Sequence, residues 1–262
     1  MRRWIPFVKT PPSVSVIRLS GAIGIGSRGL DGTVMRPVIE KAFRGKPEAI
    51  ALEINSPGGS AVQSSLIASQ IRQMAEEKEI PVVAFVEDVA ASGGYWLATA
   101  ADEIFVDHSS VVGSIGVISA SFGAHEFIGR YGIERRVYTA GESKSMLDPF
   151  KPEKEEDVAR LKRILDEIHE TFKEQVRRRR EGKLNGEDLF TGEIWVGQRA
   201  IEVGLADGIG HLLPEMKTRY GDKVRIRRFG RRRPLLGRLG AQLVDDTAAM
   251  LEERAAYARF GL

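Results

Sequence analysis

The sequence predicts an α/β fold with a mostly parallel sheet, and three observations support this prediction. Short apolar runs that suit strands alternate with stretches of helical spacing along the first half of the chain. The runs at residues 49–54 and 81–86 are apolar throughout, as in strands that are buried on both faces. A turn cluster follows each of these two runs. We therefore expect right-handed βαβ units that build one sheet.

The expected elements follow in order along the chain. We expect strands at residues 13–19, 49–54, 81–86, 103–106, 113–118 and 136–138, and helices at residues 34–43, 60–77 and 95–101. A longer helix opens at Pro152 with acidic residues in its first turn and the run 177–180 (RRRR) at its end, which matches the helix macrodipole. We expect this helix to pack on the sheet or on a partner subunit through an apolar face of Val158, Leu161, Leu165, Ile168, Phe172 and Val176.

The length of 262 residues predicts one large domain with appendages. We place an N-terminal extension at residues 1–12, the main domain at 13–221, and a basic, amphipathic C-terminal appendage at 222–262. No apolar stretch approaches the roughly 20 residues that span a bilayer, and the apolar N-terminal run is too short for a signal peptide. These features predict a soluble or peripheral protein.

Composition excludes several kinds of chemistry. The chain has no cysteine, so disulfides, cysteine-ligated metals and thiol nucleophiles are excluded. The formal net charge is only +3, but residues 177–180 and 223–233 are dense basic runs. They are solvated faces or they contact an anionic lipid or a nucleic acid. We do not expect nucleic-acid binding, because run 223–233 lacks interleaved aromatic residues other than Phe229.

Ser92 is the candidate nucleophile. It lies in AASGGY (residues 90–95), directly after the apolar run 81–86 and before a stretch with helical spacing. A strand–turn–helix of this kind places a hydroxyl at a helix N-terminus, where free N–H groups favour developing negative charge.

A serine hydroxyl needs a base to remove its proton. Histidine is the usual base, but none of the four histidines lies in a turn of small residues, and each suits a surface or capping role. They are His108, His125, His169 and His211. Lys144, in GESKSM (residues 141–146), is the alternative base, provided that burial lowers its pKa. A loop lysine taken alone is usually exposed, so the assignment of Lys144 depends on the rest of the pattern.

A glycine turn, NSPGG at residues 55–59, closes one buried strand and precedes a helix. Adjacent glycines let the backbone approach a ligand closely. Their N–H groups are one half of a candidate oxyanion hole, and the N–H of Gly93 is the other half. The alternative is an ordinary turn at the start of a helix.

Four motifs taken together resemble the signal peptide peptidase A family of serine–lysine peptidases. They are NSPGG (55–59), ASGGY (91–95), GSIGV (113–117) and GESK (141–144), and they occur in the family's order and spacing. A later block, TGEIWVGQRA (191–200) followed by GLAD (204–207), resembles the family's C-terminal signature. The resemblance covers about residues 14–215.

The resemblance implies a Clp protease/crotonase-like fold of repeated βαβ units with a long C-terminal packing helix. It implies that Ser92 is the nucleophile, Lys144 the general base, and Ser114 a hydrogen-bond partner of the lysine amine. Gly59 and Gly93 supply the oxyanion N–H groups. No cofactor and no metal are implied, and the implied partners are peptide substrates and further copies of the chain. From the residues themselves, we expect a protein that is cytoplasmic or peripheral at the inner membrane, with an anionic membrane as a further partner.

The sequence departs from the family pattern in two ways. Family members usually carry an N-terminal membrane anchor, which is not found here, and the basic C-terminal appendage is not part of the pattern. Two alternatives remain open. A crotonase-type acyl-CoA enzyme would share the fold and the glycine turn but would not need Ser92 and Lys144 together. A non-catalytic, membrane-associated scaffold would use the appendage.

Overall fold

The computed structural model describes residues 11–24, 29–141, 143–186, 188–230 and 254–262. The chain divides into two compact units. The first comprises Met1–Ile115 and Phe172–Leu262, and the second comprises Gly116–Thr171. The expected N-terminal extension falls almost entirely outside the described residues, as do residues 231–253 of the expected C-terminal appendage.

The first unit is built on one eight-stranded sheet with the order β6-β5-β3-β2-β1-β8, to which β4 and β7 are added beside β3. All pairings are parallel except β5 with β6. The strands are β1 (Ser13–Ser20), β2 (Ala49–Ser56), β3 (Val82–Ala91), β4 (Glu103–Val106), β5 (Val111–Gly113), β6 (Ile194–Val196), β7 (Gly208–Ile209) and β8 (Arg225–Phe229). The predicted α/β class with repeated parallel βαβ units is confirmed.

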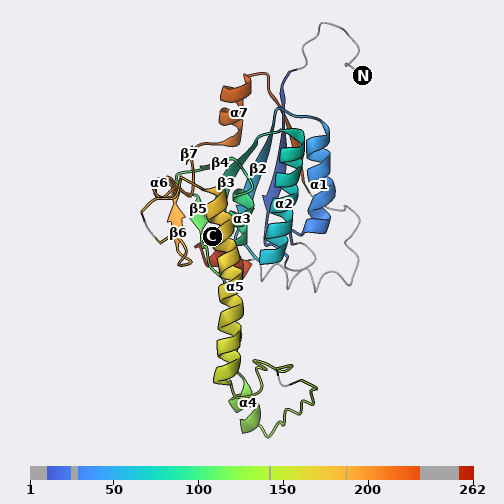
Figure 1. The fold of residues 1–262 in the computed structure, drawn as a ribbon, viewed down its shortest axis with the longest axis vertical. Coiled ribbons are helices and arrows are strands. Elements are labelled where there is room, and N and C mark those ends of the chain that lie inside the picture. The colour runs from blue at the N-terminus through green and yellow to red at the C-terminus, as the bar shows by residue number, and fades with distance from the viewer. Residues whose placement is uncertain (1–10, 25–28, 142, 187, 231–253) are drawn as a thin grey trace. The chain divides into compact units, whose positions relative to one another are not determined.

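Helices cover the two faces of this sheet unequally (Figure 1). Alternate residues of β1 and β2, such as Ile17 and Leu52, face the larger core under α1 and α2. The residues between them, such as Val16 and Ala51, face a smaller core under α7. The helices are α1 (Gly32–Arg44), α2 (Ala61–Lys78), α3 (Gly93–Ala98), α4 (His125–Arg130), α5 (Glu155–Arg179), α6 (Gly197–Glu202) and α7 (Leu212–Tyr220).

Side-chain caps fix where the first two helices begin. The carboxylate of Asp31 accepts hydrogen bonds from the N–H groups of Thr33 and Val34 at the start of α1. The hydroxyl of Ser60 accepts one from the N–H of Gln63 at the start of α2. Each cap satisfies N–H groups that the helix leaves free. Because Ser60 is the N-cap, α2 begins directly after the glycine turn.

Two predicted strands differ in the structure. A strand was expected at residues 113–118, but β5 covers Val111–Gly113 and ends where the expected strand begins. Gly113 (φ 102°) and Ser114 (φ 49°) adopt left-handed conformations that a strand does not continue. No strand forms at residues 136–138, where Tyr138 is 92% exposed. A strand needs a paired neighbour and a buried face, and this segment of the second unit has neither among the described residues.

Parts of both basic runs belong to the folded first unit and not to a solvated surface. Residues 225–229, which we assigned to the appendage, form β8 and pair with β1 at the edge of the main sheet. In the other run, Arg180 is only 2% exposed, and its guanidinium donates to the carbonyl of Gly204 and to Asp207. The interpretation of this run as a solvated face is therefore wrong for Arg180.

Candidate active site

The candidate nucleophile, Ser114 and the glycine turn all lie at the carboxyl ends of three adjacent strands. Ser56 of β2 is paired with Ala90 of β3, and Ala91 of β3 is paired with Gly113 of β5. The carboxyl ends of neighbouring parallel strands are where α/β proteins place their ligand sites. The register therefore brings together three of the four motifs that the sequence singled out.

Ser92 occupies a strained turn between β3 and α3. Its backbone has φ 51° and ψ −121°, a conformation that costs a residue with a side chain about 1–3 kcal/mol. The strain is held from both sides, because the Ser92 N–H donates to the carbonyl of Gly113 at 2.8 Å and the Ser92 carbonyl accepts from Trp96 at 3.0 Å. The hydroxyl makes no capping hydrogen bond to α3. The strained turn thus holds this hydroxyl away from the helix that it precedes.

The glycine turn is in direct contact with the Ser92 turn. A Cβ atom on Gly58 would lie 2.8 Å from the carbonyl oxygen of Ala91 and 2.8 Å from the Cβ of Ser92. Gly58 and Gly59 also have φ values of 103° and 143°, which side chains rarely allow. Glycine is required at both positions by conformation and by space.

The N–H groups of Gly59 and Gly93 are neighbours. A Cβ on Gly93 would lie 3.4 Å from the nitrogen of Gly59, and it would overlap the hydroxyl oxygen of Ser64. Within the described part of the chain, neither N–H donates a hydrogen bond. Gly93 is the first residue of α3, where the helix itself offers no acceptor. Two free donors beside a serine hydroxyl are the elements of an oxyanion hole.

Ser114 is positioned by the downstream block at residues 191–200. Its N–H donates to the carbonyl of Glu193 at 2.6 Å, and β6 pairs with β5 so that Trp195 is opposite Val112. A Cβ atom on Gly113 would lie 2.6 Å from the ring of Trp195, so this ring leaves no room for a side chain at position 113. This block therefore fixes the end of β5, and with it Ser114.

The second downstream block, residues 204–207, is hydrogen-bonded to α3. The hydroxyl of buried Tyr95 donates to the carbonyl of Leu205 at 2.9 Å. Asp207 accepts from the N–H of Ile104 and from the side chains of Arg180 and Lys183, each at 2.7 Å. Burial raises the pKa of Asp207, but the hydrogen bonds from Arg180 and Lys183 outweigh burial and hold the pKa below its usual value. Sequence reasoning missed this buried ion pair, since no local pattern marks an arginine whose partner is 27 residues away.

Lys144 lies in the second unit, in a turn where its N–H donates to the carbonyl of Gly141. Its side chain is exposed, so the residues that the structure describes do not supply the burial that a neutral lysine base requires. The neighbouring hydroxyl of Ser143 accepts a hydrogen bond from Arg160 of α5. The pairing of Lys144 with Ser92 and Ser114, which belong to the first unit, stays a prediction.

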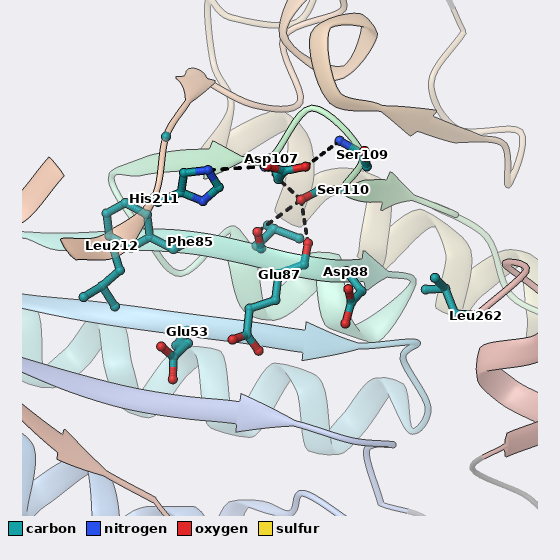
Figure 2. Close-up of a pocket in the computed structure, with 12 residues that line it drawn as sticks. Glu53, Phe85, Glu87, Asp88, Asp107, Ser109, Ser110, His211, Leu212 and Leu262 are labelled. Carbon is teal, nitrogen blue, oxygen red and sulfur yellow. Dashed lines mark hydrogen bonds and ion pairs between the residues drawn. The ribbon is translucent and has the colours of Figure 1, made fainter. Parts of the chain in front are cut away.

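The described residues offer no group of three or more His, Asp or Glu side chains arranged to hold a metal ion. Of the histidines, His211 lies 3.4 Å from a carboxylate oxygen of Asp107. Both line a cavity of about 400 Å³ on the sheet face that α7 partly covers (Figure 2). Burial, and then the charge of Glu53, raise the pKa of Glu87 in this cavity. Its lining includes neither Ser92 nor the glycine turn.

A parallel α/β fold that holds a serine in a strained turn beside free N–H groups is the arrangement that serine hydrolases use. The model of peptidase family S49 matches residues 74–219, and the model of the NfeD1b N-terminal domain matches residues 16–126. The S49 match covers more than half of the chain and includes Ser92, Ser114 and Lys144. The chain belongs to peptidase family S49, which confirms the resemblance to the signal peptide peptidase A family.

Two relatives and one solved structure illustrate the range of similar proteins. A Na⁺/H⁺ antiporter NhaA of Brucella melitensis is 46% identical over 291 residues, covering 100% of this chain and 39% of the antiporter. The chloroplastic serine protease SPPA of Arabidopsis thaliana is 33% identical over 172 residues, covering 64% of this chain and 25% of the protease. The chain thus spans well under half the length of these relatives. The solved structure of a membrane-bound stomatin-specific protease has a TM-score of 0.47 and 14% identity, covering 84% of this chain and 99% of the other.

Among the residues that the structure describes, no helix combines the length and the apolar character that crossing a bilayer requires.

Proposed function

We propose that this chain is a serine endopeptidase in which Ser92 attacks the peptide carbonyl and Lys144 is the general base. The observation that carries the proposal is the strained Ser92 turn in contact with the Gly58–Gly59 turn, with two N–H groups that donate to none of the described residues. This arrangement has no use in a purely structural loop, because it keeps a hydroxyl and two donors unpaired at a cost in strain.

The proposed reaction begins with transfer of the Ser92 proton to neutral Lys144 as the serine oxygen bonds to the carbonyl carbon. The oxyanion of the tetrahedral intermediate accepts hydrogen bonds from the N–H groups of Gly59 and Gly93. The intermediate collapses when the bond to the amine breaks and Lys144 gives its proton to that amine. Water then attacks the acyl-enzyme, with Lys144 again as the base, and restores Ser92. Ser114 holds the lysine amine in place during both steps.

A lysine can act in this way only where water is excluded, since burial is what lowers its pKa. Lys144 is exposed in the single chain. We therefore include self-assembly in the proposal, with another copy of the chain covering this part of the second unit. Support comes from the exposed apolar side chains of that unit, which include Ile118, Phe122, Phe127, Tyr131 and Tyr138.

The proposed substrates are extended peptides with small or apolar side chains, such as cleaved signal peptides or other membrane-derived peptides. A water-excluding groove around an uncharged lysine favours such side chains. The proposed location is the cytoplasm or the inner membrane surface, with the basic C-terminal residues against anionic lipid. The family membership and the serine protease among the relatives support a peptidase more directly than they support these substrates.

The antiporter name of the Brucella relative gives a second candidate activity. Exchange of sodium ions for protons makes no use of a strained serine beside two free N–H groups, so the site favours peptide hydrolysis.

The test compares the intact chain with Ser92→Ala, Lys144→Ala and Lys144→Arg in a peptide-turnover assay. We expect each substitution to lower kcat by about 10⁴-fold or more with the melting temperature unchanged, because each removes a member of one catalytic unit. A fluorophosphonate probe should label the wild-type chain at Ser92. Near-normal turnover by Lys144→Ala would show that the base is wrongly assigned, and turnover by Ser92→Ala would exclude the proposed nucleophile.

A further inference from the structure

The C-terminal residues 254–262 lie on the sheet face opposite α1 and α2, at the end where the candidate site is formed. Tyr257 and Phe260 pack against a small buried cluster of Val89, Ala91 and Val111. Leu262 lines the cavity on the same face, beyond Asp88 (Figure 2). Ala91 directly precedes Ser92, so this segment packs against the strand that carries the candidate nucleophile.

The hydroxyl of Tyr257 also reaches the strand that carries the glycine turn. It donates to the carbonyl oxygen of Asn55 at 2.7 Å, and the N–H of Gly21 donates to the same oxygen at 2.9 Å. Asn55 opens the segment 55–59 that ends in Gly59. Tyr257 thus contacts both β2 and β3, just before β2 leads into the glycine turn and β3 leads into Ser92.

The two strands are irregular at this level. Ile54 is paired with Val86 and Ser56 with Ala90, so β2 advances by two residues where β3 advances by four. The two extra residues of β3 break the ladder of backbone hydrogen bonds, although an even number keeps the side chains on their proper faces. Asn55 lies opposite this break, and its own ladder bonds are made with β1, where it is paired with Ser20 and accepts from the N–H of Gly21.

Side chains replace the missing ladder at this break. The amide of Asn55 donates to Asp88 at 2.5 Å, and the hydroxyl of Ser110 lies 2.5 Å from the carbonyl oxygen of Glu87. The bond from Tyr257 is a further contact at this level. It is added to the ladder bond that the Asn55 carbonyl already accepts from Gly21, and it comes from 202 residues away in the sequence.

We propose that residues 254–262 are a positioning element of the catalytic site, with Tyr257 as the positioning residue that holds the bulged end of β2 and β3. The kinetic part of this proposal rests on the proposed peptidase function. Tyr257 does not touch substrate in this proposal. It acts through Asn55 on the glycine turn, whose N–H groups must stay aligned with the oxyanion, and misplacement by about 1 Å can cost up to about 10²-fold in rate.

The test uses the full chain with Tyr257→Phe, which removes the hydroxyl and keeps the ring. The matched control is Tyr220→Phe, which makes the same change at a tyrosine packed at the α7 end of the same sheet face. We expect Tyr257→Phe to lower kcat by about two- to tenfold, the effect of one hydrogen bond, with KM unchanged. The melting temperature should stay within a few degrees of the wild-type value, and the control should match the wild type.

Hydrogen–deuterium exchange gives a second measurement that does not depend on catalysis. In Tyr257→Phe, the amides of residues 55–59 and 92–95 should exchange faster than in the wild type and in Tyr220→Phe. A second variant, Phe260→Ala, removes packing from the same segment and should increase exchange at the same amides.

The outcomes separate this proposal from the proposed function. If the wild type cleaves peptides, and Tyr257→Phe matches it in kcat and in exchange, the positioning role is wrong. A rise in KM at constant kcat would also overturn it. If the wild type does not cleave peptides, the proposed function fails, and the exchange comparison still decides the role of Tyr257.

Discussion

The two units of the chain differ in which side chains they bury and which they expose. In the first unit, polar groups such as Ser56, Ser110 and Arg180 are buried and hydrogen-bonded. In the second unit, no residue that the structure describes is buried, and large apolar side chains such as Phe122 and Tyr138 are exposed. The nucleophile and oxyanion candidates therefore lie in a unit that has its own buried core. The candidate base lies in a part whose apolar side chains are exposed among the residues that the structure describes.

This difference shows which half of the candidate site is preorganised. Preorganised donors stabilise a transition state because they need no reorganisation during the reaction. The strained Ser92 turn and the tightly packed glycine turn meet that condition within one chain. A lysine base can meet it only after it is desolvated, so its environment is the part that assembly is proposed to supply.

The largest expected effect comes from removing a buried arginine of the first unit, compared with an exposed arginine of the second. Arg180→Met should lower the free energy of unfolding by about 3–5 kcal/mol, because it removes the buried guanidinium that donates to Asp207 and to the carbonyl of Gly204. The same change at exposed Arg136, which pairs with Glu134 in the second unit, should cost no more than about 1 kcal/mol. Urea unfolding followed by circular dichroism measures both values. Equal costs at the two positions would contradict the contrast.

Glycine substitutions test the preorganised half directly. Gly58→Ala places a Cβ against Ala91 and Ser92 at positive φ, so we expect strain of about 1–3 kcal/mol and displaced oxyanion donors. Turnover should fall about 10²- to 10³-fold.

The matched control for Gly58→Ala is Gly123→Ala in the second unit. No atom lies within 4 Å of a Cβ at this position, and stability should change by less than about 0.5 kcal/mol. Peptide turnover and thermal unfolding of both variants are the measurements. A Gly58→Ala protein with wild-type turnover would show that the close contact has no catalytic role.

The pH dependence of stability should reflect Asp207. Its pKa in the folded chain lies below the ordinary value of about 4, so its contribution is full above that value. The contribution is lost as the pH falls through the lowered folded pKa. Asp207→Asn should therefore be much less stable than the wild type at neutral pH, and the difference should shrink below about pH 4. Thermal melts at about pH 7, 5 and 3 test this sign, and a difference that is constant over this range would contradict it.

The smallest effect on the isolated chain is expected at the exposed aromatic residues of the second unit. Phe122→Ser should change monomer stability by less than about 0.5 kcal/mol, since the side chain is 71% exposed. Sedimentation should nevertheless show weaker self-association than the wild type. Unchanged assembly would remove Phe122 from the proposed contact surface, and a large loss of monomer stability would contradict its exposure.

The sequence predicted the parts of the fold that local patterns control. The buried strands β2 and β3 are readable as short apolar runs, and the start of α2 follows from Ser60 after two glycines. The positions of Ser92 and of the glycine turn after buried strands were also readable, whereas the role of Ser114 came from the family resemblance. These features depend on residues close together in the chain, where side-chain periodicity and turn chemistry are visible.

Features that depend on distant partners were not readable. Residues 136–138 have the composition of a strand but have no neighbour to pair with among the described residues, whereas the basic residues 225–229 form a strand because β1 offers an edge. Arg180 and Tyr257 gave no local signal, because their acceptors, Asp207 and Asn55, are brought to them only by the fold.

The sequence alone therefore determined the α/β class and the positions of the core strands along the chain, and it nominated the residues of the candidate site. Only the tertiary structure decided where strands end, which charges are buried and what supports the Ser92 turn. The physical reason is that backbone propensity and hydrophobic pattern act over a few residues. The free energy of a buried charge or an edge strand is set by whichever part of the chain folds against it.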